Sequence, residues 1–559
     1  MHNMQTLSAP VVFKAGLAAL LLSATAPLRA AQPEPDWPKA DPAAVARWQA
    51  MRFGMFIHWG PVSLTGHEIG WSRGNQTPIE VYDSLYKRFN PTNFNAAEWV
   101  AAAKTAGMKY IILTTKHHDG FCLWDTKETD YNIMNSPFHR DVVKELSVAC
   151  KKQRIAFGTY YSTCDWHHPD FPLTSPGGRK KRPQSDLDSY NRYLLAQIKE
   201  LITNYGPLLT IWNDVPQEFK GRGARTISMV RQLQPDILIN NRTGDGGDYD
   251  TPEQRVGKYQ ADRPWETCMT ICRQWSWKPN DEMKSLKQCI QTLVTCAGGD
   301  GNLLFNVAPT PDGIIEPRQV GRLKEIGAWL EKNGGSIYGT RGGPWMPAQF
   351  FCSTRKGSSI FLHLLHEDDG EVRLPALPRK VISASLMSGG RAKVTEEAET
   401  LRIRFDPAAI DPIDTIVRLE IEGSAMDLPA IAVKSDVNAT ASNVFQNKQH
   451  EYGPQQVLDR DPHTRWATDS GTKQAWLAID LGKTLTVQRV RIEEAIANRV
   501  QRFELQCLSD QGWKTIVAGK TIGRWFQATF KPVTAREFRV NILDATDGPT
   551  IADIEFFPE

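Results

Sequence analysis

Short apolar runs alternate with helix-patterned segments between about residues 45 and 340 of the chain. In the segments between the runs, apolar side chains recur three and four positions apart, which is typical of amphipathic helices. In the last of these segments, residues 316–335, the apolar side chains share one face and Asn333-Gly334 provides a helix stop. Seven alternations predict a parallel (β/α) barrel rather than a doubly wound sheet. The expected strands are residues 52–60, 110–120, 155–162, 208–214, 236–243, 265–271 and 301–309.

After residue 340 the apolar period changes to two, and turn residues separate the runs. Residues 345–425 therefore predict a β-sandwich. A second all-β region follows a linker-like stretch, and its turn spacing is typical of a sandwich or jelly roll. The fold class is multidomain, α/β followed by all-β, with a barrel over residues 31–344, a sandwich over 345–425 and a β jelly roll over 426–559.

The first 30 residues have the order of a secretory signal. Lys14 precedes an apolar run at residues 15–26, and small residues follow at Ala30 and Ala31. The run is shorter than the roughly 20 residues that span a bilayer. We expect cleavage near Ala30, an exported protein that is periplasmic or extracellular, and no membrane insertion after cleavage. A retained anchor is the alternative.

Charge, cysteine content and the lack of a glycine motif argue against nucleic-acid, zinc and nucleotide sites. The 66 basic side chains nearly balance 63 acidic ones, so no basic surface for nucleic acid is expected. The nine cysteines are scattered and contain no CxxC pair, which excludes a zinc ribbon and a disulfide framework. No GxGxxG follows any expected strand, which removes the main support for a nucleotide site. In an exported protein, such cysteines suggest buried thiols with at most one or two bridges.

Polar and aromatic side chains occur at the ends of nearly all expected barrel strands, where the active sites of such barrels are built. Aromatic faces beside hydrogen-bonding groups suit a sugar. A metal hydrolase fits less well because His117 and His118 are adjacent and should project to opposite sides, one into the site and one into the core. The strand-end groups are His58-Trp59, residues 116–119, Tyr160-Tyr161, residues 212–214, Asn241-Arg242 and Trp265-Glu266.

Cleavage of a glycosidic bond needs two carboxylates, one of them an acid. Asp214 closes an otherwise apolar strand, so its charge would be partly desolvated, which suggests a nucleophile. The acid could be Glu253, in the segment after the fifth strand, or Glu266, at the sixth. Glu68, after the first strand, is a third carboxylate within reach. The residues alone do not rank these three.

Seven ordered motifs over residues 45–345 resemble the retaining α-L-fucosidases of glycoside hydrolase family 29, whose fold is a (β/α)-type barrel followed by a β-sandwich. The resemblance implies that Asp214 is the nucleophile, although the family's usual glycine after it is Val215 here. It favours Glu253 over Glu266 as acid/base, and it implies no cofactor for catalysis. Expected sugar contacts are His58, Glu68, Trp71, His117, His118, Tyr161, Trp212, Trp265 and Glu266. The motifs are RFGMFIHWGP, HEIGWSRG, KHHDGFCLWDT, GTYYSTCDW, NYGPLLTIWND, PWETCMTI and GNLLFNVAPTPDG.

The last 125 or so residues resemble a discoidin-type (coagulation-factor C-terminal type) module, the fold of many carbohydrate-binding domains. The resemblance rests on ASNVF, VLDRDPHTRWATD, WLAIDLG and TIADIEFF. It implies a structural calcium ion, with Asp459, Asp461 and Glu555 as expected ligands. Sugar binding by this module is slightly favoured over a purely structural role.

Together these features predict an exo-acting retaining α-L-fucosidase that removes terminal α-L-fucosides from oligosaccharides or glycoconjugates by double displacement. Its expected partners are fucosylated glycans. Two alternatives stay open. The same site could act on another α-L-glycoside, such as an L-galactoside, because an apolar pocket discriminates poorly against one added hydroxyl. Alternatively, the chain could be a catalytically inactive, exported glycan-binding protein.

Overall fold

The computed structural model describes residues 37–172, 182–215, 220–348, 350–365, 370–433, 437–459, 461 and 463–558. The predicted signal peptide, residues 1–30, lies outside them. None of the helices in these ranges is long and apolar enough to cross a membrane.

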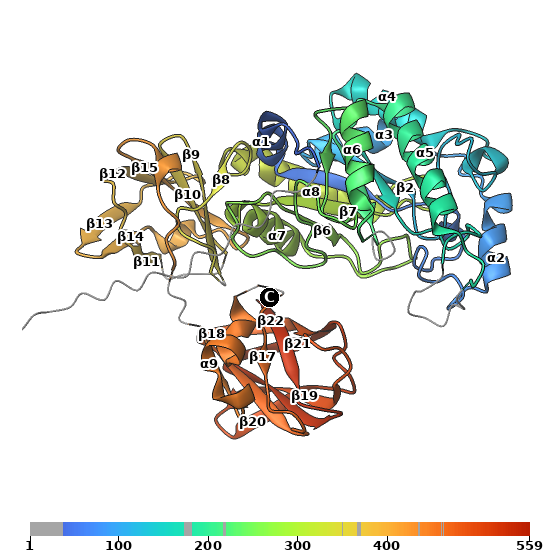
Figure 1. Ribbon diagram of the computed structural model, residues 1–559. Helices are drawn as coiled ribbons and strands as arrows, with labels where there is room; N and C mark the ends of the chain where they lie inside the picture. Colours follow the sequence, from blue (N-terminus) through green and yellow to red (C-terminus); the bar gives the residue numbers. More distant parts are fainter. Residues whose placement is uncertain are drawn as a thin grey trace, which may run out of the picture. The chain divides into compact units, whose positions relative to one another are not determined.

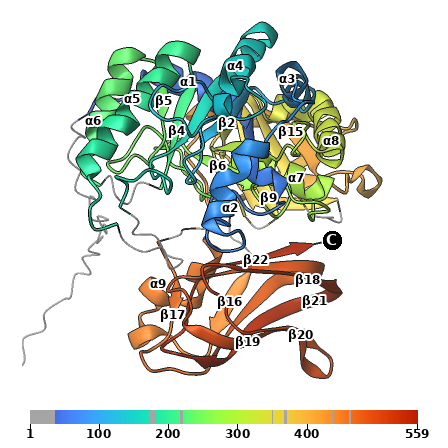
Figure 2. The ribbon, with the colours of Figure 1, turned by 90° about the vertical axis from the view of Figure 1, so that its right-hand side faces the viewer.

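The seven strands expected in the first part of the chain form one parallel sheet, in the order β5-β4-β3-β2-β1-β7-β6. The predicted curled (β/α) barrel architecture is confirmed, and helices cover the outside of the sheet (Figures 1 and 2). The strands are β1 (Phe53–Ile57), β2 (Tyr110–Lys116), β3 (Ala156–Ser162), β4 (Thr210–Asp214), β5 (Leu238–Ile239), β6 (Glu266–Thr270) and β7 (Asn302–Val307). The helices are α1 (Pro42–Met51), α2 (Ile79–Ser84), α3 (Ala96–Thr105), α4 (Val142–Gln153), α5 (Leu187–Tyr205), α6 (Gly223–Leu233), α7 (Leu286–Gly298) and α8 (Pro317–Asn333).

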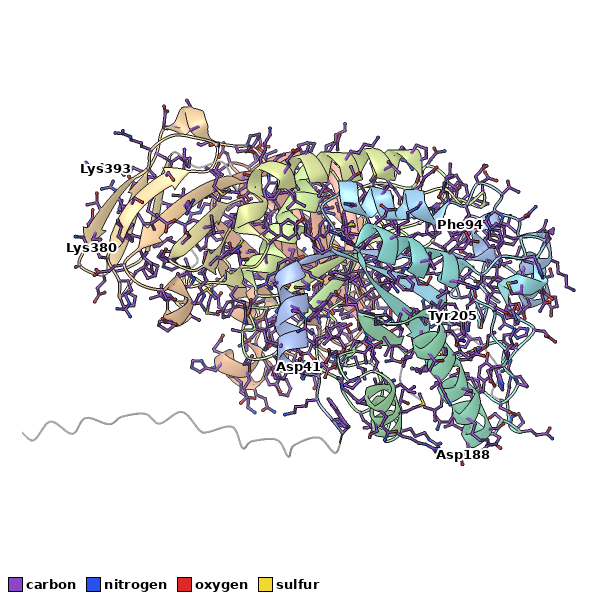
Figure 3. All side chains as sticks on the ribbon, turned by 90° about the horizontal axis from the view of Figure 1, so that it is seen from above. Asp41, Phe94, Asp188, Tyr205, Lys380 and Lys393 are labelled. Atoms are coloured by element: carbon purple, nitrogen blue, oxygen red, sulfur yellow. The ribbon has the colours of Figure 1, made fainter. Side chains whose placement is uncertain are left out.

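Local signals explain where these helices begin. The carboxylate of Asp186 caps α5 by accepting hydrogen bonds from the amides of Asp188 (2.9 Å) and Ser189 (3.0 Å). Figure 3 labels Asp188 and Tyr205 near the two ends of this helix. One face of α5, including Leu194, is buried against the barrel, so a single amphipathic stripe fixes the helix on the sheet.

An irregular segment, residues 248–254, fills the gap between β5 and β6. Its backbone is bridged to Asn240 on one side and to Trp265 and Cys268 on the other. The amide of Asp248 donates to Ile239 O at 2.7 Å, and the amide of Cys268 donates to Pro252 O at 3.0 Å. We call these residues the closing segment, because they take the place of an eighth strand and satisfy the edges of β5 and β6.

The inside of the barrel is packed with aromatic rings rather than with aliphatic side chains alone. Phe56, Tyr110, Tyr160 and Trp212 belong to this interior cluster. The ring of Tyr110 fits only because its neighbour on β1 is Gly54, where an added Cβ would lie 2.2 Å from the ring. The floor beneath the strand ends is therefore a rigid aromatic layer.

The two predicted β-domains are also present. The sandwich pairs a five-stranded sheet, β12-β15-β10-β9-β8, with a three-stranded sheet, β11-β14-β13. The C-terminal module is a separate antiparallel β-sandwich with its own core, in which Trp466 and Phe538 are fully buried. The sandwich strands are β8 (Arg341–Gly342), β9 (Phe351–Lys356), β10 (Ser359–Leu364), β11 (Glu371–Pro375), β12 (Val381–Leu386), β13 (Lys393–Glu397), β14 (Thr400–Arg404) and β15 (Thr415–Ile421). The module contains β16 (Asn438–Ala441), α9 (Gln449–Tyr452), β17 (Trp466–Ala467), β18 (Ala475–Glu494), β19 (Val500–Ser509), β20 (Gly512–Gly519), β21 (Phe526–Ala545) and β22 (Thr550–Pro558).

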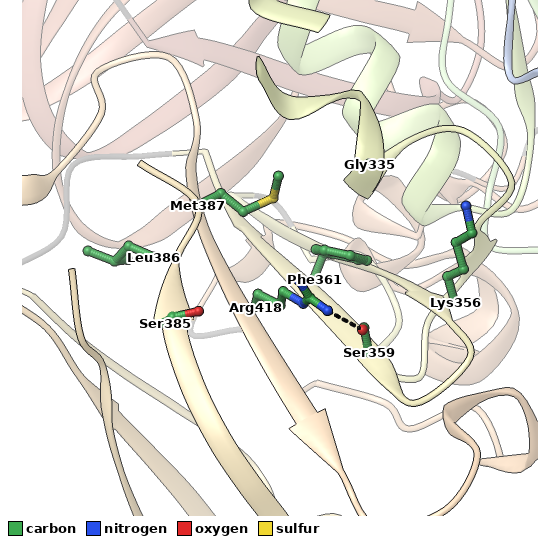
Figure 4. Close-up of a pocket in the computed structure, with 8 residues that line it drawn as sticks. All are labelled: Gly335, Lys356, Ser359, Phe361, Ser385, Leu386, Met387 and Arg418. Atoms are coloured by element: carbon green, nitrogen blue, oxygen red, sulfur yellow. Dashed lines mark hydrogen bonds between the residues drawn. The ribbon is translucent and has the colours of Figure 1, made fainter. Parts of the chain in front are cut away.

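All nine cysteines are buried and have free thiols. This agrees with the expectation of mostly buried thiols, and none of the thiols is placed in a bridge. A cavity of about 550 Å³ lies on the sandwich sheet, where Arg418 donates to Ser359 (Figure 4). None of the eight residues that line it is a carboxylate or a histidine, so it lacks the groups that hydrolysis requires.

A buried ion pair joins Arg52, just before β1, to Asp300, in the turn between α7 and β7. The side chains of Arg52 and Asp300 are 0% and 1% exposed and lie 2.7 Å apart. Arg52 also donates to Thr340 O and Gly301 O, while Arg341 binds the same carboxylate. Although burial raises the pKa of Asp300, its two arginine partners keep that pKa below the usual range.

We predict that Arg52→Met lowers the free energy of unfolding by about 3–5 kcal/mol, because it leaves Asp300 buried and without this partner. The measurement is urea unfolding followed by tryptophan fluorescence. Arg47→Met is the matched control, because the Arg47–Asp236 pair is exposed and 3.8 Å long, and its loss should cost less than about 1 kcal/mol. Equal effects of the two substitutions would contradict the role given to Arg52.

Candidate active site

Asp214 ends β4 with its carboxylate at the carboxyl end of the barrel, and its side chain is 15% exposed. Oδ1 accepts hydrogen bonds from Arg242 Nη1 (2.7 Å) and from the Val215 amide (2.9 Å). Oδ2 accepts from the Tyr160 hydroxyl (2.8 Å) and lies 3.7 Å from His118 Nε2. Burial alone would raise the pKa of Asp214, but Arg242 and His118 outweigh it and hold the pKa below the usual range. The carboxylate is therefore ionised and oriented.

Arg242 connects this carboxylate to a second one. Its Nη1 atom lies 2.7 Å from Asp214 Oδ1 and 3.0 Å from Glu253 Oε2. The two carboxylate oxygens are therefore at most about 6 Å apart, which fits the roughly 5–5.5 Å of retaining glycosidases better than the wider spacing of inverting ones. Glu253 is the more exposed of the pair, at 34%. The closing segment carries it, so the missing eighth strand supplies the second carboxylate.

Both adjacent histidines reach the site, so the expectation that one of them is a core residue was wrong. Strand β2 ends at Lys116, and the alternation of strand side chains no longer applies at His117 and His118. The ring of His117 stacks on Tyr160 at a centroid distance of 5.5 Å, and His118 Nδ1 lies 2.8 Å from Ser162 Oγ. Burial lowers the pKa of His117 well below its usual value, so this ring is neutral.

The third histidine, His58, follows β1 and is 3% exposed. Its Nδ1 lies 2.7 Å from Asn306 Oδ1. Burial lowers the pKa of His58 to about 3, despite the hydrogen bond with Asn306. The ring centroid of Trp275 lies 4.7 Å from that of His58. Neither Trp275 nor Asn306 is among the residues predicted from the sequence. Trp275 lies on the long loop after β6, and Asn306 lies within the apolar strand β7.

Tyr161 does not line the pocket. Its hydroxyl donates to Gln197 on α5 at 2.8 Å and accepts from Lys116 Nζ at 2.8 Å. Its neighbour Tyr160 faces the barrel interior and binds Asp214 instead. Successive side chains of a strand point to opposite faces, so only one of the two tyrosines can reach the site.

Trp265 and Glu266 lie at the start of β6 rather than at its end, so neither reaches the site. The indole of Trp265 packs outside the barrel and donates to Gly299 O at 3.1 Å. Glu266 is fully buried inside the barrel, where it accepts hydrogen bonds from Tyr110 and from Trp212 Nε1. Burial raises the pKa of Glu266 to about 7. Trp212 forms the floor of the site, stacked on Tyr160 at 5.6 Å and beneath the guanidinium of Arg242 at 4.8 Å.

Two expected residues lie on the loop after β1. Trp71 is 42% exposed at the mouth, with its ring 5.3 Å from that of His118. The carboxylate of Glu68 accepts hydrogen bonds from the amides of Trp275 and Ser276, each at 3.0 Å. Glu68 therefore holds another loop, and its oxygens are already used within the protein.

The three expected calcium ligands do not form a cluster. Asp459 accepts from the Thr464 hydroxyl at 2.9 Å, and Asp461 accepts from the His463 amide at 3.1 Å. Glu555, on β22, is paired with Arg491 at 3.2 Å. Within the described ranges, no three His, Cys, Asp or Glu side chains gather as a metal site. These three side chains therefore give no support to the expected calcium ion, which stays a prediction.

Val215 occupies the position where the resemblance leads one to expect glycine. Its φ is +53°, in the left-handed region that β-branched residues rarely adopt. Thr163 holds this conformation by donating to Val215 O at 2.6 Å. The backbone that orients Asp214 is thus kept without glycine.

We predict that Tyr160→Phe lowers kcat/KM by about ten- to a hundredfold, because a hydrogen bond to a charged group contributes about 1.5–3 kcal/mol. This bond stabilises the ionised form of Asp214, so its loss raises the pKa and moves the acid limb of the pH–rate profile to higher pH. Tyr161→Phe is the matched control, and it should leave that limb in place. A shift of the acid limb in Tyr161→Phe instead would reverse the assignment.

Two stretches of the chain match known protein families. Residues 20–335 match the α-L-fucosidase family, and residues 438–556 match the F5/8 type C domain. The human tissue α-L-fucosidase is 30% identical over 62% of this chain and 82% of its own length.

Solved structures of fucosidases are also similar to this chain. An α-L-fucosidase isoenzyme from Paenibacillus thiaminolyticus has a TM-score of 0.63 and 33% identity, covering 68% of this chain and 99% of that one. The α-fucosidase of Thermotoga maritima has a TM-score of 0.59 and 28% identity, covering 67% and 96%. With a carboxylate pair at the carboxyl end of its barrel, the chain belongs to the α-L-fucosidase family of glycoside hydrolases and carries a C-terminal F5/8 type C domain.

Proposed function

We propose that the protein is an exo-acting, retaining α-L-fucosidase that releases terminal α-L-fucose from oligosaccharides or glycoconjugates. The observation that carries this proposal is the bridge of Arg242 between Asp214 and Glu253. The bridge keeps the two carboxylates within the separation at which one can attack the sugar and the other can protonate the leaving group. An inactive glycan-binding protein would have no use for this pair.

The proposed reaction uses the two groups in turn. Asp214 Oδ attacks the anomeric carbon while protonated Glu253 gives its proton to the departing glycosidic oxygen, so the bond to the leaving group breaks as the ester to Asp214 forms. Glu253, now a carboxylate, takes a proton from water. The resulting hydroxide adds to the anomeric carbon, and Asp214 leaves as a carboxylate. Two inversions give net retention.

The difference in exposure between the two carboxylates supports exo-action. Asp214 is 15% exposed and lies over the closed floor of Trp212 and Tyr160. Glu253, at 34%, lies nearer to solvent, where a leaving group and then a water molecule can approach. A blocked floor admits one terminal sugar from the mouth, and no chain can thread through. The glycans that carry such a sugar are the proposed partners.

Azide distinguishes the roles of the carboxylates. With an aryl α-L-fucoside, Asp214→Ala should lose at least about 10³-fold in kcat, and added azide should yield the β-fucosyl azide after a single inversion. Glu253→Ala with azide should yield the α-fucosyl azide, because azide then attacks the fucosyl ester. NMR of the anomeric proton identifies each product.

Glu266→Ala is the control for the acid/base assignment. Because Glu266 lies inside the barrel, azide should not restore its activity. Rescue of Glu266→Ala with formation of the α-azide, and no rescue of Glu253→Ala, would reverse the assignment. Inverted stereochemistry of the wild-type product would overturn the retaining mechanism.

We also propose that the protein is exported to the periplasm or the extracellular space. The support is the order of Lys14, the apolar run at residues 15–26 and the small residues at Ala30 and Ala31. Mass spectrometry of the protein from its native host should find a mature N-terminus close to residue 31. Recovery of an uncleaved chain in the cytoplasm would contradict export, and recovery in the membrane pellet would indicate a retained anchor.

A further inference from the structure

The side chain of Asn306 lies between a backbone carbonyl and a pocket histidine. Asn306 is on β7 and is 1% exposed. Its Nδ2 donates to Trp275 O at 2.7 Å, and its Oδ1 lies 2.7 Å from His58 Nδ1. One buried amide therefore contacts a loop on one side and the imidazole on the other.

The chemistry of these three groups allows only one arrangement of protons. The Trp275 carbonyl can only accept, so it must face the amide nitrogen of Asn306. The amide oxygen then faces His58, and because this oxygen can only accept, His58 Nδ1 must carry a proton. Burial lowers the pKa of His58 to about 3, so the ring is neutral and holds no second proton. His58 Nε2 is therefore a lone-pair acceptor.

The carbonyl group of Trp275, which fixes the orientation of the Asn306 amide, is itself held in place. Oε2 of Glu68 accepts from the Trp275 amide at 3.0 Å, and Oε1 accepts from the Ser276 amide at 3.0 Å. Asp281 accepts from the amides of Arg273 and Gln274, each at 2.9 Å. The loop over residues 273–276 is thus fixed by two carboxylates, and the direction of the Trp275 carbonyl is fixed with it.

No hydrogen bond to His58 Nε2 is found among the residues that the structure describes. The ring nevertheless belongs to the pocket, since its centroid lies 5.6 Å from that of His117 and 5.7 Å from that of Tyr160. A fixed acceptor without a protein partner, in a pocket for a polyhydroxylated ligand, calls for a donor on the ligand.

We propose that Asn306 and Glu68 are positioning residues that hold His58 as its Nδ1–H tautomer, so that Nε2 accepts a hydrogen bond from a hydroxyl group of the bound sugar. The proposal rests on the proposed function, because it assumes a sugar in the pocket. In this arrangement Glu68 holds the loop over residues 273–276 and does not contact the sugar. It also makes His58 selective for the direction of a hydrogen bond, since a group that only accepts is rejected there.

Deoxy and deoxyfluoro ligands test the direction of this bond, because covalent fluorine can accept weakly but cannot donate. Binding of aryl α-L-fucosides altered at position 2, 3 or 4 is measured by calorimetry on Asp214→Asn, which cannot form the ester. At one position, replacing the hydroxyl by hydrogen or by fluorine should weaken binding equally, by about tenfold. In His58→Phe that tenfold difference should disappear, since the acceptor is gone.

Retention of most of the affinity by the fluoro ligand at the position that depends on His58 would overturn the proposal, because it would make His58 a donor. The absence of any position whose contribution depends on His58 would also overturn it. Failure of the wild-type enzyme to turn over the parent aryl fucoside would instead overturn the proposed function. The two failures are distinguishable.

Asn306→Asp tests the part played by the amide. A carboxylate offers no N–H to Trp275 O and attracts a second proton to His58, so Nε2 becomes a donor. The other titratable groups near His58, namely Asp214, His117 and His118, are unchanged. We expect kcat/KM to fall by at least about tenfold, with KM rising, and a new acid limb in the pH–rate profile.

The ¹⁵N NMR spectrum gives a readout that a purely structural role would not move. In the wild type, His58 should show a protonated Nδ1 and an unprotonated Nε2, and in Asn306→Asp it should show both nitrogens protonated. Asn204→Asp, at an exposed position on α5, is the matched control and should keep the wild-type spectrum and profile. Glu68→Gln should raise KM more than it lowers kcat. A wild-type spectrum with the proton on Nε2 would overturn the proposal.

Discussion

The site depends on the ion pair between Asp214 and Arg242. A carboxylate that is 15% exposed above an aromatic floor remains ionised only if a cation compensates its desolvation. Arg242 does so at 2.7 Å, and its flat guanidinium also lies over the ring of Trp212. The same nitrogen holds Glu253, so one side chain sets both the charge of the buried carboxylate and the distance to its partner. The closing segment, packed between β5 and β6, makes this geometry possible because it carries Glu253 to that point.

The barrel strands could be predicted because each is encoded locally as a short apolar run, and an amphipathic helix follows every one of the first six in chain order except β5. The closing segment could not be, because residues 248–254 are polar and have no period. Their strand-like pairing is imposed by the free edges of β5 and β6, which exist only once the sheet has curled. Glu253 could therefore be named as a carboxylate of interest from the sequence, but its place beside Arg242 follows only from the closure of the barrel.

The direction of side chains was the weakest part of the sequence interpretation. Tyr160 and Tyr161 differ by one position, and alternation states only that one of them faces inward. Asp214 and Trp212 are two positions apart on β4 and share its inner face. The register that aligns Asp214 with Ser162 of β3, however, is set by strand pairing and cannot be read from the sequence. Glu266 was placed at the wrong end of its strand, since an apolar run marks the extent of a strand less sharply than its centre. Asn306 and Trp275 carry no signal of their own, because their roles depend on contacts between residues far apart in sequence.

A neutral sugar cannot be recognised by net charge, so recognition in this pocket must depend on the direction of hydrogen bonds. The imidazoles of His58 and His117 are held neutral by burial, and each neutral ring is a donor at one nitrogen and an acceptor at the other. Which nitrogen faces the ligand is decided by what lies behind the ring. For His58 that is an amide whose own direction is set by a backbone carbonyl. The orientation of a peptide group in the loop after β6 thereby becomes a chemical property of the pocket, and a rigid loop serves specificity as directly as a side chain that touches the sugar.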